Sequence, residues 1–310
     1  MSGQINSDGS NSLPTDIATA YQSTTEALRT YHAVGQLPAA GIAESLIFVN
    51  NETLHNTEYL ARKIMVNATA GNSVTALVEE LLTHQNQEGG FGDLPGYAST
   101  PPDTAWTLEA LALAGQVSST AASYGVSYLV SQQTVDGRWS SGNPAAIYTS
   151  ALVVQALTPY KVIYASVPNV IAAGIGYLMG ARDNSTQWGE PFLTAQALLA
   201  IAPNLTDLSP LQTTINNFTA IQRAEGSWSG DVFQTALALR ALKTIETATA
   251  DPTLGRLRGV VIDAQTQLPL ANVGVTLTGS IAAAAVTNGI GRGNRTGTPV
   301  KSRKATITDL

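Results

Sequence analysis

The chain has 310 residues, of which only 12% are charged, and its 22 acidic and 16 basic side chains give a net charge of −6. This length suffices for a large buried core, no apolar run is long enough to cross a bilayer, and no basic stretch interleaved with aromatic residues suggests nucleic-acid binding. Because the chain contains no Cys, disulfides and thiol chemistry are excluded.

The first thirteen residues are polar, and we expect residues 1–13 to be disordered. They also lack the features of a signal peptide. From residue 14 to residue 249, apolar side chains recur at helical spacing. Helices are expected first over residues 15–35, 40–50 and 56–66.

A seven-residue signature, Gln-x-x-x-Gly-x-Trp, then recurs along the chain. It occurs at residues 133–139 (QTVDGRW) and 222–228 (QRAEGSW), with a variant at 85–91 (QNQEGGF) and a weaker one at 182–188 (RDNSTQW). Such a fixed repeat indicates a repeat architecture. The residues that define it are Gln85, Phe91, Gln133, Gly137, Trp139, Trp188, Gln222, Gly226 and Trp228.

An Ala-rich helix pattern, [Thr/Ser]-Ala-x-x-[Leu/Val]-x-Ala-[Leu/Ile], follows each signature. Its copies start at Thr104, Ser150, Thr194 and Thr235, which are 46, 44 and 41 residues apart. Helices with a broader apolar stripe precede each signature. About eleven helices fit before residue 250, so the predicted fold is mainly α, an α/α toroid of five to six helical hairpins over residues 14–249 with the Ala-rich helices inside.

The signature has a structural interpretation that requires no chemistry. Its Gly permits a positive φ where the outer helix ends. Its Gln amide, with two donors and an acceptor, can bind free backbone groups at the start of the next helix. Its aromatic side chain can cover the joint between repeats. We therefore interpret the signature as a fastening between hairpins.

The signature matches the QW repeat of squalene-hopene and oxidosqualene cyclases. Residues 89–96 (GGFGDLPG), with Asp103 and Thr104, are similar to the repeats of protein prenyltransferase β subunits. Over residues 40–248, and more loosely over 15–40, the chain thus resembles the prenyltransferase and squalene oxidase repeat superfamily. The resemblance implies an α/α toroid, and it leaves the reaction open.

The catalytic groups of these relatives are missing from the sequence. There is no Asp-x-Asp-Asp acid, no Cys for a thioester or a zinc site, and the three histidines, His32, His55 and His84, are not spaced as a zinc pair. Aromatic residues make up only 6% of the chain, which is few for the aromatic-lined cavity that a carbocation needs. We predict no catalytic residue, no metal and no cofactor, and favour a protein that is not an enzyme.

Three acidic residues near the starts of inner helices, Asp103, Glu190 and Asp231, are the remaining candidates for a site. Helix capping and compensation of the helix dipole explain them most simply. The alternative is a ligand site at one rim of the ring. Glu109, in the middle of a helix, shares its register with Gln155, Leu199 and Arg240, and a solvated position is expected for it.

The chain changes character after residue 250. No aromatic residue follows Phe233, and the net charge changes from −10 over residues 1–250 to +4 over 251–310. Residues 250–256 are expected to form a linker. Residues 257–289 resemble the start of a carboxypeptidase-regulatory-like β-sandwich, in the pattern Gly-x-Val-x-Asp, a polar turn, then Pro-Leu-x-x-Val-x-Val. Residues 290–310 are expected to form a basic, irregular tail, which suggests a fragment of a longer protein or a frameshifted end.

Three functions remain open at this point. The favoured one is a non-catalytic scaffold or ligand-binding module of a larger, secreted or cell-surface protein, with cytoplasm as the alternative location. The second is a terpenoid-cyclase-like enzyme with an unusual acid, Asp103 or Asp231, and the third is a small-molecule carrier. The sequence identifies neither the partner or ligand nor the oligomeric state. A deep aromatic cavity with a buried carboxylate would favour the cyclase, and a lumen filled by Ala and Leu would favour the scaffold.

Overall fold

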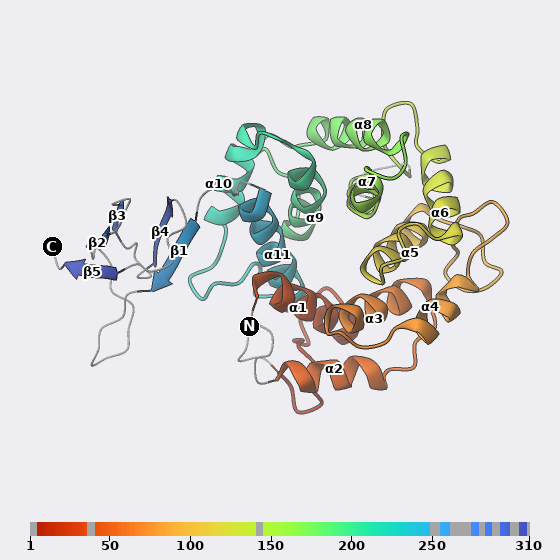
Figure 1. Cartoon of the computed structure of the whole chain (residues 1–310), viewed down its shortest axis with the longest axis horizontal. Coiled ribbons are helices and arrows are strands. Elements are labelled where there is room, and N and C mark those ends of the chain that lie inside the picture. The colour runs from red at the N-terminus through yellow and green to blue at the C-terminus, as the bar shows by residue number, and fades with distance from the viewer. Residues whose placement is uncertain are drawn as a thin grey trace. The chain divides into compact units, whose positions relative to one another are not determined.

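The computed structural model describes residues 5–35, 41–140 and 145–248 and five strands after residue 254 (Figure 1). The chain divides into two compact units, residues 1–248 and 249–310. In its described part the first unit has eleven α-helices: α1 Ala20–Val34, α2 Ile42–Asn51, α3 Thr57–Thr69, α4 Thr75–Leu82, α5 Pro101–Leu113, α6 Thr120–Ser131, α7 Ala145–Leu157, α8 Val167–Gly180, α9 Pro191–Ile201, α10 Gln212–Ala220 and α11 Val232–Ala248. Three short 3₁₀ helices lie at Thr158–Tyr160, Ala202–Asn204 and Ser209–Leu211.

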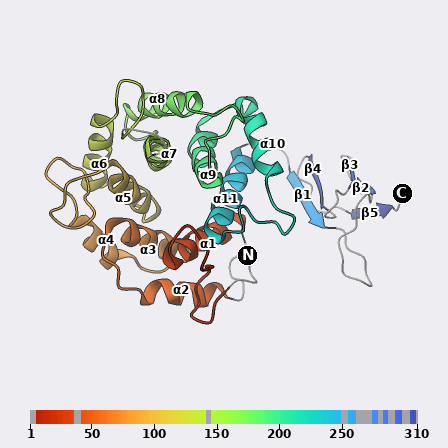
Figure 2. The same ribbon diagram turned by 180° about the vertical axis from the view of Figure 1, so that it is seen from behind.

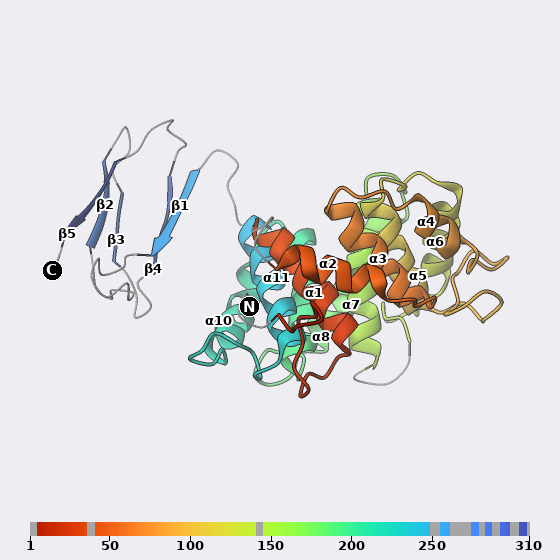
Figure 3. The same ribbon diagram turned by 90° about the horizontal axis from the view of Figure 1, so that it is seen from below.

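The helices form two concentric rings. Helices α1, α3, α5, α7, α9 and α11 make the inner ring, and α2, α4, α6, α8 and α10 lie outside it, as Figures 1 and 2 show from opposite faces. Figure 3 shows the same unit edge-on. Since each outer helix returns the chain to the same rim, the inner helices all run in the same direction. The predicted α/α toroid, with its Ala-rich helices inside, is confirmed.

The ring is closed by its first and last helices. Helix α1 packs along α11, and Thr30 Oγ1 donates to the carbonyl of Ala236 over 2.8 Å. Two aspartates complete the junction, because Asp231 accepts from the backbone N–H of Ile17 at 2.7 Å and Asp16 accepts from that of Val232 at 2.9 Å. Groups more than two hundred residues apart in the sequence thus hold the ring together.

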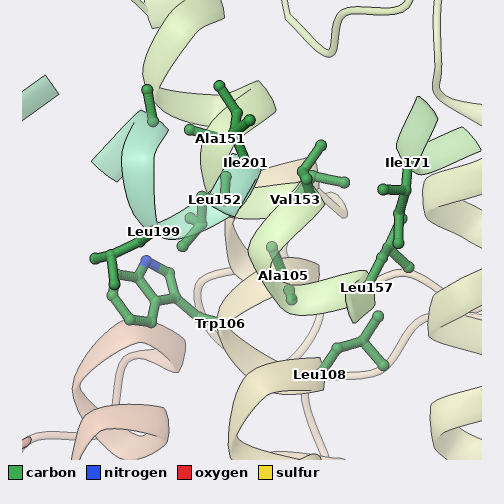
Figure 4. Packing of buried hydrophobic residues seen from close by; sticks show 14 of the residues in the cluster. Ala105, Trp106, Leu108, Ala151, Leu152, Val153, Leu157, Ile171, Leu199 and Ile201 are labelled. Atoms are coloured by element: carbon green, nitrogen blue, oxygen red, sulfur yellow. The ribbon is translucent and has the colours of Figure 1, made fainter. Parts of the chain in front are cut away.

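The core between the two rings is built from Ala, Leu and the signature tryptophans. Figure 4 shows the close packing of Ala105, Ala151 and Leu152 on inner helices. Close packing is possible because alanine lets neighbouring backbones approach. The tryptophans are fully buried, and each indole N–H donates to a carbonyl of its own outer helix: Trp139 to Leu129, Trp188 to Leu178 and Trp228 to Phe218.

The signature turns that are followed by another outer helix also contact that helix. Gln133 Nε2 donates to Gly137 O within the turn and to Val170 O in the first turn of α8, both at 2.9 Å. Gly137 has φ +88°, and a Cβ there would lie 2.3 Å from the carbonyl oxygen of Ala173 in α8. The Gln amide therefore joins two outer helices, where we expected it to bind the start of an inner helix.

A fifth turn of this kind lies at residues 5–11, within the segment expected to be disordered. Ile5 and Asn11 pair as Gln85 and Phe91 do, and Gly9, with φ +89°, lies against the carbonyl of Glu44 in α2. Asn11 replaces the aromatic residue and donates from its backbone N–H to Thr24 of α1. Because buried hydrogen bonds hold this turn, the expectation of disorder is wrong for residues 5–13.

The second unit is described only as five strand backbones: β1 Gly255–Val260, β2 Gly274–Thr278, β3 Ala283–Val286, β4 Arg292–Gly297 and β5 Lys304–Thr308. Strands β1 and β4 pair antiparallel, with Gly255 opposite Gly297. Strand β2 lies between β3 and β5 and is antiparallel to both. Each strand thus pairs with at least one other strand of the unit.

The predictions for this segment have different outcomes. Strands β4 and β5 lie within residues 290–310, for which we expected an irregular tail because the segment is basic, low in apolar residues and without alternation. The linker at 250–256 lies mostly outside the described residues, as do the connections at 261–273, 279–282, 287–291 and 298–303. The carboxypeptidase-regulatory-like β-sandwich therefore stays a prediction. In the described part of the chain, no helix is both long and apolar enough to cross a bilayer.

Candidate functional site in the lumen of the ring

The lumen of the ring is lined by three layers of side chains that the helix pattern identifies. We aligned the inner helices on the pattern residue, Thr104 in α5 and its equivalent Thr24 in α1. In a helix, positions two before, two after and five after this residue share one face. Contacts between different inner helices at these positions show that this face lines the lumen.

The layer nearest the starts of the inner helices is half-buried and partly aromatic. Gln22 Nε2 donates to Glu58 Oε1 across it at 2.9 Å. Burial and the charge of Glu58 raise the pKa of Tyr148, so this phenol stays neutral at physiological pH. The layer consists of Gln22, Glu58, Pro102, Tyr148, Phe192 and Phe233.

The middle layer closes the lumen, since all six of its side chains are buried. Three of them are apolar, Trp106, Leu152 and Leu237, and Figure 4 labels the first two. Two are charged, Glu26 and Arg62. Arg62 is completely buried and stacks on Trp106, with its guanidinium carbon 4.3 Å from the ring centroid. The six residues are Glu26, Arg62, Trp106, Leu152, Gln196 and Leu237.

Glu26 lies at the centre of a buried charge cluster. Its side chain is only 1% exposed, and it accepts a hydrogen bond of 2.6 Å from Arg240 Nε. Two further guanidinium groups lie close to its Oε2 atom, Arg29 at 3.6 Å and Arg62 at 3.7 Å. Arg62 also donates to Glu58 at 2.8 Å. Three inner helices, α1, α3 and α11, are joined through this carboxylate.

The surroundings of Glu26 keep it ionised. Burial alone raises the pKa of a carboxyl group, but the charges of Arg240, Arg29 and Arg62 outweigh burial and hold the pKa of Glu26 below its ordinary value. Burial lowers the pKa of Arg240, and the neighbouring Arg29 lowers it further. A carboxylate held in this state accepts hydrogen bonds and does not donate protons at neutral pH.

A second chain of polar groups crosses the lumen one turn further along. Arg29 Nη2 donates to Glu109 Oε1, which also accepts from Gln155 Nε2 at 2.6 Å. Gln155 Oε1 in turn accepts from Gln196 Nε2 at 3.0 Å. The chain connects α1, α5, α7 and α9. Together with the Glu26 cluster, it places polar groups of all six inner helices in contact across the lumen.

A cavity of about 450 Å³ opens at the far ends of the inner helices. Arg29, Glu109, Gln155 and Arg240 line its polar side. Within the described residues, Arg29 Nη1 and Glu109 Oε2 are buried and have no hydrogen-bond partner. The remaining lining residues are mostly apolar: Ala112, Leu113, Thr158, Pro159, Leu199, Pro203 and Thr244. This cavity is a concave site in the described part of the lumen.

Comparisons with known proteins agree with this architecture. The family model of the squalene-hopene cyclase C-terminal domain matches residues 59–149. Type II terpene cyclase MstE from Scytonema superposes with a TM-score of 0.60 at 16% identity, over 79% of this chain and 95% of that one. The helical unit is a terpenoid cyclase-like α/α toroid.

Two further structures support the same fold. A protein from Actinoplanes gives a TM-score of 0.61 at 16% identity, over 79% of this chain and 96% of that one. The ent-copalyl diphosphate synthase from Streptomyces platensis gives 0.59 at 16% identity, over 73% of this chain, which spans half of that protein's length. No curated protein matches the sequence. At this level of identity the likeness establishes the fold of the toroid and no activity.

The toroid carries the three predicted rim residues at the starts of its inner helices, well separated around the ring. Asp231 is buried, and it accepts from the backbone N–H of Gln234 in the first turn of α11 as well as from Ile17. Asp103 accepts from the Thr100 hydroxyl at 2.6 Å, and Thr100 itself caps α5. Glu190 is exposed and makes no side-chain cap. Local hydrogen bonds thus occupy two of the three, and a ligand role for them stays a prediction.

The charged residues of the toroid's lumen were not among the predicted site residues. Glu109 was expected in solvent, and it is buried because Arg29 of α1 reaches it across the ring. The signal was present, since Arg29, Glu109, Gln155 and Arg240 occupy equivalent positions. The signal is weak in α1, because Thr25, Thr30 and Tyr31 replace the two alanines and the last Leu or Ile of the helix pattern. The described residues hold no group of three His, Cys, Asp or Glu that could bind a metal.

Proposed function

We propose that the toroid is a non-catalytic recognition module, which binds a ligand or partner and carries out no cyclisation. The observation that supports this most strongly is the Glu26 cluster in the closed middle layer. Cyclisation of an isoprenoid by this type of fold needs a neutral acid to protonate the substrate, and Glu26 is held ionised by three arginines.

The charges of the lumen support the same proposal. A carbocation is stabilised by aromatic faces and destabilised by nearby cations. In the middle of this lumen the guanidinium group of Arg62 already occupies the face of Trp106. A positively charged intermediate near Trp106 would be repelled by Arg62. The indole face that could stabilise the intermediate is already occupied by the guanidinium group.

A turnover assay tests the proposal. The full chain would be incubated with squalene and with a geranylgeranylated arene, and extracts would be analysed by gas chromatography and mass spectrometry, with a squalene-hopene cyclase as positive control. We expect no cyclised product beyond that of the heat-inactivated chain. Cyclised product from the native chain, reduced in an Asp103→Asn variant, would contradict the proposal.

One observation favours the alternative, a cyclase-like enzyme. Burial raises the pKa of Asp103, which lies beside the half-aromatic first layer of the lumen. A raised pKa favours the neutral, proton-donating form of a carboxyl group. Against this role, Asp103 Oδ2 already accepts from Thr100 Oγ1. The Asp103→Asn variant in the same assay separates the alternatives, because only the enzyme would lose product.

A third alternative is a small-molecule carrier. A carrier binds a small molecule and releases it intact, whereas a scaffold binds a protein partner. A thermal-shift screen against isoprenoids and corrinoids separates the carrier from the scaffold. A carrier would be stabilised by one of these compounds, and a protein-binding scaffold would not.

We infer a secreted or cell-surface location from composition. The chain has few charged residues and no Cys, and strands follow the helical unit. Fractionation of the native source with an antibody against the toroid tests this inference. Recovery in the culture medium or on the cell surface would support it, and recovery only in the cytosol would overturn it.

A further inference from the structure

The outer ring of the toroid has one helix fewer than the inner ring in the described part of the chain. Outer helices follow α1, α3, α5, α7 and α9, and among the described residues none follows α11, which packs directly on α1 (Figure 1). The outward face of α11 therefore differs from the outward faces of the other inner helices.

The other inner helices show what covers this face. The fifth and eighth residues of the Ala-rich pattern are fully buried in α5, where they are Leu108 and Leu111. Leu108 lies under the outer helix α6, because a Cβ on Gly125 would be 3.1 Å from its Cδ2. The equivalent residues of α11, Leu239 and Leu242, are only half-buried. The equivalent residues of α7 and α9 are fully buried as in α5: Val154, Leu157, Leu198 and Ile201.

The signature turn before α11 shows the same difference. In the turn before α5, Gln85 Nε2 donates to Ala121 O in the first turn of α6 at 2.9 Å, and Gly89 is buried. In the turn before α11, Gln222 is exposed, and among the described residues its Nε2 donates only to Gly226 O within the turn. The amide that holds α6 in one repeat is thus accessible in the last one.

We propose that this face binds an amphipathic α-helix of a partner protein. The helix lies against α11 as α6 lies against α5. Its apolar stripe covers Leu239 and Leu242, and a carbonyl of its first turn accepts from Gln222 Nε2. The inference rests on the proposed role of the toroid as a recognition module, for which it names the kind of partner.

The repeat itself selects a helix as the occupant. The face continues the established interface between the inner ring and the outer ring, in which every other position is filled by a helix. Leu239 and Leu242 are three residues apart and so present one apolar surface, which suits the apolar stripe of a helix. Gly226 has nothing closer than 3.9 Å to an added Cβ, so a backbone carbonyl can approach it as Tyr124 O approaches Gly89.

The partner helix needs a small residue where it crosses Leu239. In α6 this residue is Gly125, and in α8 it is Gly174, where a Cβ would lie 2.6 Å from Val154 Cγ2. A larger side chain at this point would hold the two helices apart. The partner is therefore an apolar helix with Gly or Ala at the crossing point.

Helix α6 supplies a probe of this chemistry. A synthetic peptide of residues 117–132 (VSSTAASYGVSYLVSQ) contains α6 and its N-cap Ser119. The peptide would carry a fluorophore, and its anisotropy would be followed as the full chain is added. We expect saturable binding. A peptide with Gly125→Leu should bind about tenfold or more weakly, because the added side chain meets Leu239.

Matched variants of the full chain locate the binding. Leu239→Ser removes an apolar contact from α11, and Leu77→Ser makes the same change at a half-buried position of α4. We expect Leu239→Ser to weaken binding of the α6 peptide about tenfold or more and Leu77→Ser to leave it unchanged. Gln222→Ala, at an exposed position, should weaken binding about threefold through loss of one hydrogen bond. Circular dichroism verifies that each variant is folded.

Four outcomes would overturn the proposal. The first three are no binding of the α6 peptide, equal binding of the Gly125→Leu peptide, and binding that Leu239→Ser and Gln222→Ala leave intact, as when the peptide exchanges with α6 itself. The fourth is a dimer of the full chain, seen by analytical ultracentrifugation, that dissociates in Leu239→Ser, because a second copy would then cover the face. Cyclised product in the turnover assay would contradict the proposed function without changing any of these results.

Discussion

Glu26 organises the buried charges in the lumen of the ring. Its carboxylate lies among three guanidinium groups from three inner helices. Removing one partner of a buried ion pair is strongly destabilising, since the remaining charges stay buried without compensation. The same group is therefore needed for stability and unsuited to act as an acid.

We predict that Glu26→Gln lowers the free energy of unfolding by about 3 kcal/mol at pH 7. The substitution preserves the shape of the side chain and removes its charge from the arginine cluster. Urea denaturation followed by circular dichroism measures the change. Glu79→Gln, at an exposed position of α4, is the control, and an equal effect of the two substitutions would contradict the assigned role.

We expect His84 to make stability depend on pH. It is buried, its Nδ1 lies 2.7 Å from Thr57 Oγ1, and burial lowers its pKa below the ordinary value of 6.5. The unfolded chain thus binds a proton at this residue more readily than the folded chain. We predict that stability falls as pH decreases from 6.5 to the lower folded-state pKa.

Urea denaturation at several pH values between 5 and 7.5 measures this dependence. In His84→Gln the slope in that window should flatten, whereas His32→Gln, at an exposed position of α1, should keep it. The assignment to His84 fails if the stability of the unsubstituted chain rises as pH decreases through this window. It also fails if the pH dependence of stability is unchanged in His84→Gln.

At the scale of elements, the signature turn joins one outer helix to the next. Gly137 shows this through its contact with Ala173 of α8, and Gly226 provides the comparison, because its nearest neighbour to an added Cβ is Gln222 Nε2 at 3.9 Å. The two glycines have nearly the same φ, +88° and +92°. The outer helix α8 follows the turn of Gly137. In the described residues no outer helix follows the turn of Gly226, because α10 is the last of the outer ring.

We predict that Gly137→Ala destabilises the protein by about 3 kcal/mol and Gly226→Ala by about 1 kcal/mol. Both substitutions place a side chain in the left-handed region, and only the first also forces a Cβ into a backbone carbonyl. Thermal unfolding of the two variants gives the comparison. Equal effects of the two substitutions would mean that backbone strain alone, without the contact to α8, explains the requirement for glycine at position 137.

The repeats illustrate what the sequence predicts and what it does not. The turns with Gln, Gly and an aromatic residue were recognisable, and they fixed the toroid and the order of its rings. The turn at residues 5–11 has Ile5 and Asn11 in place of Gln and the aromatic residue, so it is recognised from the structure, by the pairing of Ile5 with Asn11 and the hydrogen bond from Asn11 to Thr24. Glu26 and Arg29 can be placed in the same layers as Trp106 and Glu109 only once this turn is matched to the later signature turns.

At the scale of the whole molecule, the toroid is held closed by polar contacts between its two ends. Asp231 caps the first turn of α11 and also binds the backbone of Ile17, next to α1. The N–H groups at the start of a helix lack intrahelical partners, so the carboxylate satisfies one there and one across the junction. Closure of the ring and order at the N-terminal segment are therefore coupled.

We predict that Asp231→Ala lowers the free energy of unfolding by about 2 kcal/mol and speeds hydrogen exchange at the amides of Ile17 and Gln234. Glu190→Ala, at the equivalent rim of α9 but exposed and without a cap, should change stability by less than about 0.5 kcal/mol. Hydrogen exchange read by mass spectrometry measures the local effect. Unchanged exchange at the junction in Asp231→Ala would contradict the proposed closure.

The ionisation state of Glu26 is the most direct test of the view that the lumen is a closed, non-catalytic charge network. Carboxyl ¹³C shifts of the full chain would be followed against pH, with the Glu26 signal assigned by its absence from Glu26→Gln. We predict that Glu26 titrates below its ordinary pKa of 4.5, so that its stabilising effect is lost only as pH falls through that lower value. A Glu26 that is still protonated at pH 7 would give the lumen a buried proton donor and would contradict the account.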